Sequence, residues 1–286
     1  VGVTLMASAG FATLAIGAVL KKPISDTTKV FDRNVIFNTD PNNNLSGKGV
    51  SGQVDHDLGF AKLTAITAYR NQKNASFQDI DFTGADISNN RTANTIKTFT
   101  QEVRLASSGE GPLNWLVGGF YQKEKMDTGR TITYGSDIRA FADALSGPVP
   151  ATLLGALPPT LRPALTGRSN LYALEVLQRL ATPTLVKPGL TYFQPGQGIN
   201  DFYKMNQTSY SLFGQVDYQV TDKLTLTGGL AYLNDDKKAR SNVVMNDPFS
   251  SLNLSAVPQL PALGLPGNLY SALGALQFFY GNSPTH

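Results

Sequence analysis

Residues 210–220 read Tyr-Ser-Leu-Phe-Gly-Gln-Val-Asp-Tyr-Gln-Val, and large apolar and polar side chains alternate along most of this stretch. Successive side chains of a β-strand point to opposite faces of the sheet. One face would therefore carry Tyr210, Leu212, Val216, Tyr218 and Val220. The other face would carry Ser211, Phe213, Gln215, Asp217 and Gln219. This period of two predicts a strand with one apolar face.

The same alternation recurs in residues 99–105 and 224–232. With these stretches as guides, we predict six strands. They lie at about 48–57, 61–80, 96–106, 114–134, 206–219 and 224–245. Several of them exceed the ~5–6 residues that are usual for strands of soluble proteins.

The connections between these strands alternate in length. Short connections at 58–60, 107–113 and 220–223 alternate with longer ones at 81–95, 135–205 and 246–286. Thirteen of the 16 prolines lie in the last two segments, and proline is largely confined to sheet edges, turns and loops. Short turns at one end and long loops at the other are typical of transmembrane β-barrels.

The sequence therefore predicts an all-β fold, an antiparallel transmembrane β-barrel segment of about six strands of a larger barrel, with long, partly helical extracellular loops. The predicted division is an extracellular loop region (1–46), four barrel strands in two hairpins (47–134), a long extracellular loop with short helices (135–205), a barrel hairpin (206–245) and a further extracellular loop (246–286). Helical patterns in the loops start near Ser136, which is followed by an apolar stripe up to Gly147, and at 170–177 and 268–273.

Composition argues against most catalytic chemistry. The chain has no cysteine, two histidines and a formal net charge of +3. Thiolate sites are excluded, a histidine-based nucleophile would have to rest on His56, and no basic cluster favours nucleic acid. We predict no enzymatic activity, no metal and no cofactor. Residues 79–84 imitate the start of a calcium loop, but position twelve would be Asn90 instead of glutamate, so a solvated loop tip is preferred.

Two sets of side chains are candidates for a functional site. Aromatic residues in the long loop could stack on a flat ligand, although packing in the loop's own core is the more frequent role of such rings. These candidates are Tyr134, Tyr192, Phe193, Phe202 and Tyr203. The second set comprises polar residues on the polar faces of strands, predicted to face the barrel lumen. They are Glu102, Arg104, Gln215 and Asp217.

Residues 97–107 (Lys-Thr-Phe-Thr-Gln-Glu-Val-Arg-Leu-Ala-Ser) and 113–121 (Leu-Asn-Trp-Leu-Val-Gly-Gly-Phe-Tyr) together resemble a recurrent hairpin of the TonB-dependent outer-membrane receptors. The strand at 61–70, its continuation to 78–83 and the hairpin over 210–232 are similar to the family's pattern in the same order. The resemblance covers about 49–135 and 206–250, and the loops match in character alone.

This resemblance implies a plugged barrel of about 22 strands in the outer membrane of a Gram-negative bacterium. It implies energy-coupled uptake of a scarce nutrient, such as a siderophore-iron complex, a vitamin, a sugar or an aromatic compound. The implied partners are outer-membrane lipid and a TonB-type energy-coupling protein, reached through a plug. The chain shows no plug, TonB box or C-terminal strand ending in phenylalanine, so we expect an internal segment of such a receptor. A passive porin and, less favoured, a soluble β-sandwich carbohydrate-binding protein remain as alternatives.

Overall fold

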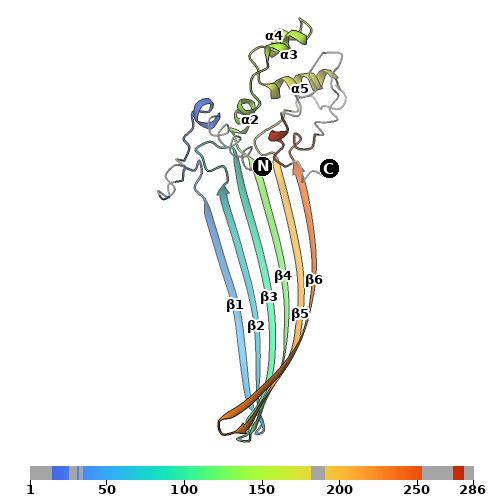
Figure 1. Ribbon diagram of the computed structural model, residues 1–286. Helices are drawn as coiled ribbons and strands as arrows, with labels where there is room; N and C mark the ends of the chain where they lie inside the picture. The colour runs from blue at the N-terminus through green and yellow to red at the C-terminus, as the bar shows by residue number, and fades with distance from the viewer. Residues whose placement is uncertain (1–14, 26–30, 32–34, 182–190, 253–272, 280–286) are drawn as a thin grey trace.

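Six long strands form one antiparallel sheet in the computed structural model, which describes residues 15–25, 31, 35–181, 191–252 and 273–279. The strands pair in chain order, β1-β2-β3-β4-β5-β6, so each hydrogen-bonds to its sequence neighbours. The tight turns gather at one end of the sheet, the turn end, and the long connections and helices at the other, the loop end (Figure 1). The predicted all-β, antiparallel barrel-segment fold is confirmed.

Three of the strands begin earlier at the loop end than the sequence predicts. Their bounds are β1 Asn42–Asp57, β2 Ala61–Asp79, β3 Ser88–Ser107, β4 Leu113–Tyr134, β5 Gly198–Thr221 and β6 Leu224–Asn246. The largest differences are at β1, β3 and β5, predicted to begin at 48, 96 and 206. Apart from Ala93, the added part of β3 is polar on both faces, so no alternation marks it, yet it pairs with β2 and β4 throughout.

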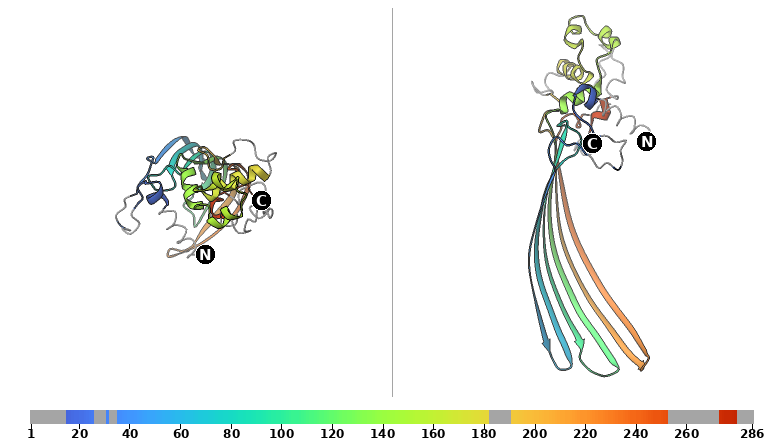
Figure 2. Two further views of the ribbon diagram at one scale, coloured as in Figure 1. Left: turned by 90° about the horizontal axis from the view of Figure 1, so that it is seen from above. Right: turned by 90° about the vertical axis from the view of Figure 1, so that its left-hand side faces the viewer.

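The two faces of the sheet differ in composition and exposure. We call them the Val216 face and the Gln215 face. In β4, Tyr121 and Lys123 on the Val216 face are exposed, whereas Gln122 and Glu124 on the Gln215 face are half-buried. This is the pattern of a curved sheet whose Val216 face is convex. Figure 2 shows that the sheet is curved.

An apolar band covers the turn-end half of the Val216 face. The pairing places residues of all six strands in it: Val50, Val54, Leu63, Ala65, Phe99, Val103, Leu105, Leu113, Trp115, Val117, Leu212, Val216, Tyr218, Leu226 and Leu230. Toward the loop end the band stops at a row of rings, Tyr69, Phe99, Tyr121, Tyr210 and Tyr232. Ring centroids of Phe99 and Tyr121 are 6.3 Å apart, as are those of Tyr210 and Tyr232. We call this line the aromatic row.

Short helices lie beyond the loop end of the sheet (Figures 1 and 2). They are η1 Ala15–Val19, α2 Ile138–Ser146, α3 Ala151–Ala156, α4 Arg162–Leu165, α5 Asn170–Ala181 and η3 Leu273–Leu276. Among the residues that the structure describes, no helix has both the length and the apolar character needed to cross a membrane.

The two helices predicted within 135–205 are present as α2 and α5. Asp137, not Ser136, precedes α2, and its side chain makes no capping bond. Ser169 caps α5, because its hydroxyl accepts the Tyr172 N–H at 3.1 Å. The predicted helix at 268–273 lies outside the described residues except for Leu273.

Candidate functional site

The connections at the loop end share a hydrophobic core, which we call the loop core. It combines residues from the β2–β3 connection, the end of β4, α2, α5 and the segments after α5 and β6: Ala85, Ile87, Tyr134, Ile138, Phe141, Leu171, Leu174, Tyr192, Phe193 and Phe249 are among them. Phe193 and Phe249 have ring centroids 4.9 Å apart, and Tyr192 meets Phe249 edge-on at 5.1 Å. Segments far apart in sequence are therefore packed into one ordered layer.

Three of the five aromatic candidates belong to this core. Tyr134, Tyr192 and Phe193 are 4%, 3% and 0% exposed, so they pack the loops, the alternative role considered for them. Phe202 and Tyr203 lie on β5 and are 50% and 36% exposed. As sequence neighbours on one strand they point to opposite faces, with Phe202 on the Val216 face and Tyr203 on the Gln215 face.

A buried ion pair links α2 to α5, and the sequence analysis did not identify it. Arg139 donates to Glu175 through both terminal nitrogens, at 2.6 and 3.1 Å, and through Nε to Asp143 at 2.9 Å. Glu175 is 3% exposed and also accepts the Tyr192 N–H at 2.8 Å. Burial alone would lower the pKa of Arg139, but Glu175 and Asp143 hold that pKa above its ordinary value. Arg139 and Asp143 lie one helical turn apart, and this spacing is the feature of the sequence that could have predicted an ion pair on α2.

Tyr192 stays neutral beside this pair. Burial raises the pKa of Tyr192 to about 12. Its hydroxyl donates to Gln178 Oε1 at 2.6 Å on α5. Tyr192 is therefore fixed at both its backbone and its ring, which makes it a structural anchor between α5 and the segment that leads into β5.

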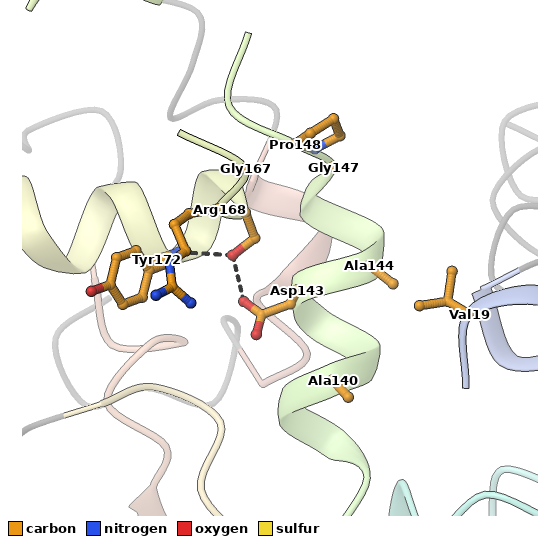
Figure 3. Close-up of a pocket in the computed structure, with 10 residues that line it drawn as sticks. Val19, Ala140, Asp143, Ala144, Gly147, Pro148, Gly167, Arg168 and Tyr172 are labelled. Atoms are coloured by element: carbon orange, nitrogen blue, oxygen red, sulfur yellow. Dashed lines mark hydrogen bonds between the residues drawn. The ribbon is translucent and has the colours of Figure 1, made fainter. Parts of the chain in front are cut away.

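A cavity of about 530 Å³ opens beside α2 and the start of α5 (Figure 3). Its lining includes Val19, Ala140, Asp143, Pro148 and Tyr172. The Ser169 hydroxyl donates to Asp143 at 2.5 Å. Arg168 lies over the Tyr172 ring, with its guanidinium carbon 5.1 Å from the centroid. The cavity combines an apolar wall with an exposed guanidinium, which suits a small, partly apolar ligand that carries an acceptor group.

The sequence predicts a solvated loop tip in the β2–β3 connection, residues 80–87. This prediction is wrong, because the connection is folded. Asp79 is 1% exposed and accepts the Asn38 N–H at 2.9 Å. Asp81 accepts N–H groups of Thr83, Ile87 and Ser88 at 3.1–3.2 Å. Burial raises the pKa of Asp81. These carboxylates are used for turn geometry, and no group of three or more His, Cys, Asp or Glu side chains among the described residues is arranged to hold a metal ion.

This connection is fastened to the start of α2 at a point where only glycine fits. A Cβ on Gly135 would lie 2.1 Å from Asp86 Oδ1. Asp86 accepts the Ser136 N–H at 2.8 Å, while Asp137 accepts the Asp86 N–H at 3.0 Å. Burial alone would raise the pKa of Asp86, but the hydrogen bonds from Ser136 and Asn89 hold it below its ordinary value.

The Gln215 face carries the four polar candidates, in bonded pairs. Arg104 Nε lies 3.0 Å from Glu102 Oε1. Gln215 Nε2 donates to Asp217 at 3.2 Å, and Asp217 accepts the Thr227 hydroxyl at 2.7 Å. Farther toward the loop end, Asp235 accepts the Ser209 hydroxyl at 2.7 Å. These pairs give the Gln215 face several mutually bonded polar side chains, in contrast to the apolar band on the Val216 face.

A sheet of long antiparallel strands with one apolar band, tight turns at one end and folded loops at the other is the architecture of a β-barrel wall. No family model matches the sequence, and no curated protein matches it. The ferric yersiniabactin uptake receptor FyuA from Yersinia pestis aligns over 72% of this chain and 23% of that chain, at 11% identity and a TM-score of 0.43. The siderophore receptor PiuA from Acinetobacter baumannii aligns over 71% of this chain and 30% of that chain, at 13% identity and a TM-score of 0.29.

The chain thus spans less than a third of the length of either receptor. Identities this low, at TM-scores below 0.5, establish no shared ligand or activity.

Proposed function

We propose that this chain forms part of the wall and the outer loops of a TonB-dependent outer-membrane receptor. Such a receptor imports a scarce nutrient of the siderophore-iron, vitamin, sugar or aromatic class across the outer membrane of a Gram-negative bacterium. The observation that carries the proposal is the apolar band that ends at the aromatic row, on the face opposite a polar face. Transmembrane barrels combine an outward apolar band, aromatic girdles and a polar interior in this way.

The slope of the aromatic row supports a membrane. Phe99 of β3 pairs with Lys123 of β4, whereas the next ring of the row is Tyr121, two residues nearer the turn end. Tyr210 of β5 pairs with Asn234 of β6, whereas the next ring is Tyr232, again two residues nearer the turn end. From β2 to β6 the row therefore shifts by about four residues toward the turn end. With ~3.3 Å per residue and ~4.8 Å between strands, a row parallel to the membrane surface implies a strand tilt of about 35°, within the range for membrane barrels.

The height of the band agrees with this tilt. In β4 it runs from Leu113 at the tight turn to Tyr121 in the aromatic row. At ~3.3 Å per residue and a tilt of about 35°, this stretch spans roughly 22 Å along the membrane normal, close to the ~25 Å apolar band of outer-membrane barrels. Trp115 and Tyr218 lie near its opposite edge and supply rings for a second girdle.

The described sheet has two edge strands, β1 and β6. Each of β1 and β6 pairs with a single neighbour in the described sheet. Unpaired strand edges are unfavourable in lipid, where every backbone N–H and C=O needs a partner. We infer that both edges pair with further strands of a larger barrel. The Gln215 face, with Glu102, Arg104, Gln215 and Asp217, then faces the lumen and a plug through which a TonB-type protein acts.

Ligand capture is assigned to the loop layer, by which we mean the loop core together with the helices and connections that pack around it. The loop core fixes α2 and α5, and the cavity beside them exposes Arg168 and Tyr172. Tyr203 remains a candidate for stacking on a ligand, because it is exposed near the loop end of β5 on the face assigned to the lumen, whereas Phe202 is exposed on the opposite, outward face. The proposed role is binding and transport without catalysis.

A soluble β-sandwich is disfavoured by one observation. A sandwich buries the apolar face of one sheet against a second sheet. The described residues form a single sheet, and Val216, Leu226 and Leu230 on its apolar band are 45%, 59% and 84% exposed. We infer that this face contacts lipid.

Energy dependence separates the receptor from a porin. Cells that produce the protein and cells that lack it should be compared for uptake of nutrients from the four classes at limiting concentration. A receptor requires the inner-membrane proton gradient, so collapsing that gradient should abolish the protein-dependent uptake. Uptake that survives collapse of the gradient would identify a passive channel.

Orientation is testable with single cysteines, because the chain has no native cysteine. Thr160, between α3 and α4, and Lys223, in the β5–β6 turn, are both exposed. We expect a membrane-impermeant thiol reagent to label Thr160→Cys on intact cells and Lys223→Cys after the outer membrane is permeabilised. The opposite order of labelling would invert the proposed topology.

A further inference from the structure

Lysines gather on the Val216 face just beyond the aromatic row. Toward the loop end, the first or second position past the rings on this face in three adjacent strands carries a lysine: Lys73 of β2 (after Asn71), Lys97 of β3, and Lys123 and Lys125 of β4. All four are exposed. We call this set the lysine belt.

The belt places like charges directly opposite each other. Lys97 pairs with Lys125 across β3 and β4, and Lys123 pairs with Phe99 in the aromatic row. Like charges in directly opposed positions of a sheet are destabilising. Among the residues that the structure describes, no carboxylate forms an ion pair with any of the four lysines, whereas Lys204 and Lys238 farther along the same face have Asp127 and Asp236 at 3.7 and 3.4 Å.

The belt also differs from the opposite face at the same level. On the Gln215 face at this level, Glu124 accepts the Thr98 hydroxyl at 3.0 Å and Arg70 of β2 pairs with Thr98, so a carboxylate and a cation are both present there. An uncompensated set of cations is therefore confined to the face assigned to lipid. Its members lie two to four residues past the rings, about 5–11 Å above the aromatic row at the proposed tilt, which is the depth of a headgroup layer.

We propose that the lysine belt binds the phosphate groups of the outer-leaflet glycolipid, with Lys97 and Lys125 sharing a phosphate and Lys73 and Lys123 flanking it. This inference rests on the proposed membrane location and adds a specific lipid contact to it. Phosphate oxygens between Lys97 and Lys125 replace the repulsion between the two ammonium groups with charge-assisted hydrogen bonds. Lysine near an anionic membrane surface contributes about 1 kcal/mol each.

The test compares two triple variants that remove the same charge. Lys97→Gln/Lys123→Gln/Lys125→Gln removes most of the belt. Lys62→Gln/Lys223→Gln/Lys237→Gln removes three lysines of the turn end and the Gln215 face. The full protein is reconstituted in phosphatidylcholine nanodiscs that contain phosphorylated lipid A, dephosphorylated lipid A or neither, in the presence of a chelator that removes divalent cations.

The measured quantities are the thermal unfolding midpoint and the lipid A retained in native mass spectra. Phosphorylated lipid A should raise the midpoint of the unaltered protein and of the control variant. The belt variant should retain at least about tenfold less lipid A, and without lipid A it should be as stable as the unaltered protein or more stable, because the Lys97–Lys125 repulsion is gone.

Equal retention by the belt variant, or equal stabilisation of the unaltered protein by dephosphorylated lipid A, would overturn the inference while leaving the membrane location intact. A protein that fails to insert into any of the three nanodiscs would overturn the proposed function and this inference together.

Discussion

Arginine at position 216 is expected to destabilise the protein in a bilayer by about 2–4 kcal/mol, the range for cations on the lipid face near the midplane of a barrel. Val216 pairs with Trp115 and Gly228 and lies between Tyr210 and Tyr218 in the apolar band. The guanidinium of Val216→Arg would therefore enter hydrocarbon with no partner on that face. Gel mobility with and without heating, and the urea midpoint in lipid vesicles, measure the change.

Gln215→Arg is the matched control, because it places the same side chain one residue away on the other face. Asp217, which Gln215 already contacts at 3.2 Å, supplies a carboxylate partner there. We expect this variant to fold with a midpoint close to that of the unaltered protein. Greater damage from Gln215→Arg than from Val216→Arg would mean that the faces are assigned the wrong way round or that no bilayer surrounds the sheet.

The second large effect is expected in the loop layer. Arg139→Met leaves Glu175, 3% exposed, without its cationic partner. Breaking a buried ion pair in this way destabilises the surrounding structure by about 3–5 kcal/mol. The loss should be local to the loops, since the sheet contributes its own pairing. We therefore expect faster hydrogen exchange in α2 and α5 and unchanged exchange in β3 and β4.

A double variant distinguishes the unpaired charge from lost packing. Arg139→Met/Glu175→Leu removes both charges and should recover much of the protection, since apolar replacements of a buried pair are often neutral or stabilising. Lys204→Met is the exposed-pair control: its partner Asp127 is 59% exposed, so a change of about 0–1 kcal/mol is expected. If Arg139→Met leaves exchange in α2 and α5 unaltered, the pair does not hold the loop layer together.

Sequence periodicity was sufficient to predict the strands in the turn-end half of the sheet. Side chains such as Tyr210, Leu212 and Val216 share one apolar face there, and a strand with one apolar face leaves an alternating pattern in the sequence. The loop-end halves of the strands lack this apolar face. Apart from Ala93, residues 88–95 of β3 are polar on both faces, and their extension depends on pairing with β2 and β4, which a local pattern does not encode.

The loop layer shows the same limit more strongly. The apolar stripes of α2 and α5 could be predicted from the sequence, because helical periodicity is a local property of the chain. The Arg139–Glu175 pair, the burial of Asp79 and the packing of Tyr134 against Phe193 depend on which segments meet in space. Aromatic residues in a long loop look alike in sequence whether they pack a core or face a ligand. Only the folded arrangement separates Tyr192 and Phe193, which are buried, from Phe202 and Tyr203, which are exposed.

The pairing of strands in chain order has a consequence for how such a wall can change over time. Every strand in the described sheet pairs only with its neighbours along the chain, and each tight turn returns the chain to the loop end. A hairpin such as β3–β4 could be lost or duplicated as a unit while the strands on either side remain antiparallel. The circumference of the barrel and the set of loops displayed above it can therefore vary independently, with the hairpin as the module of growth.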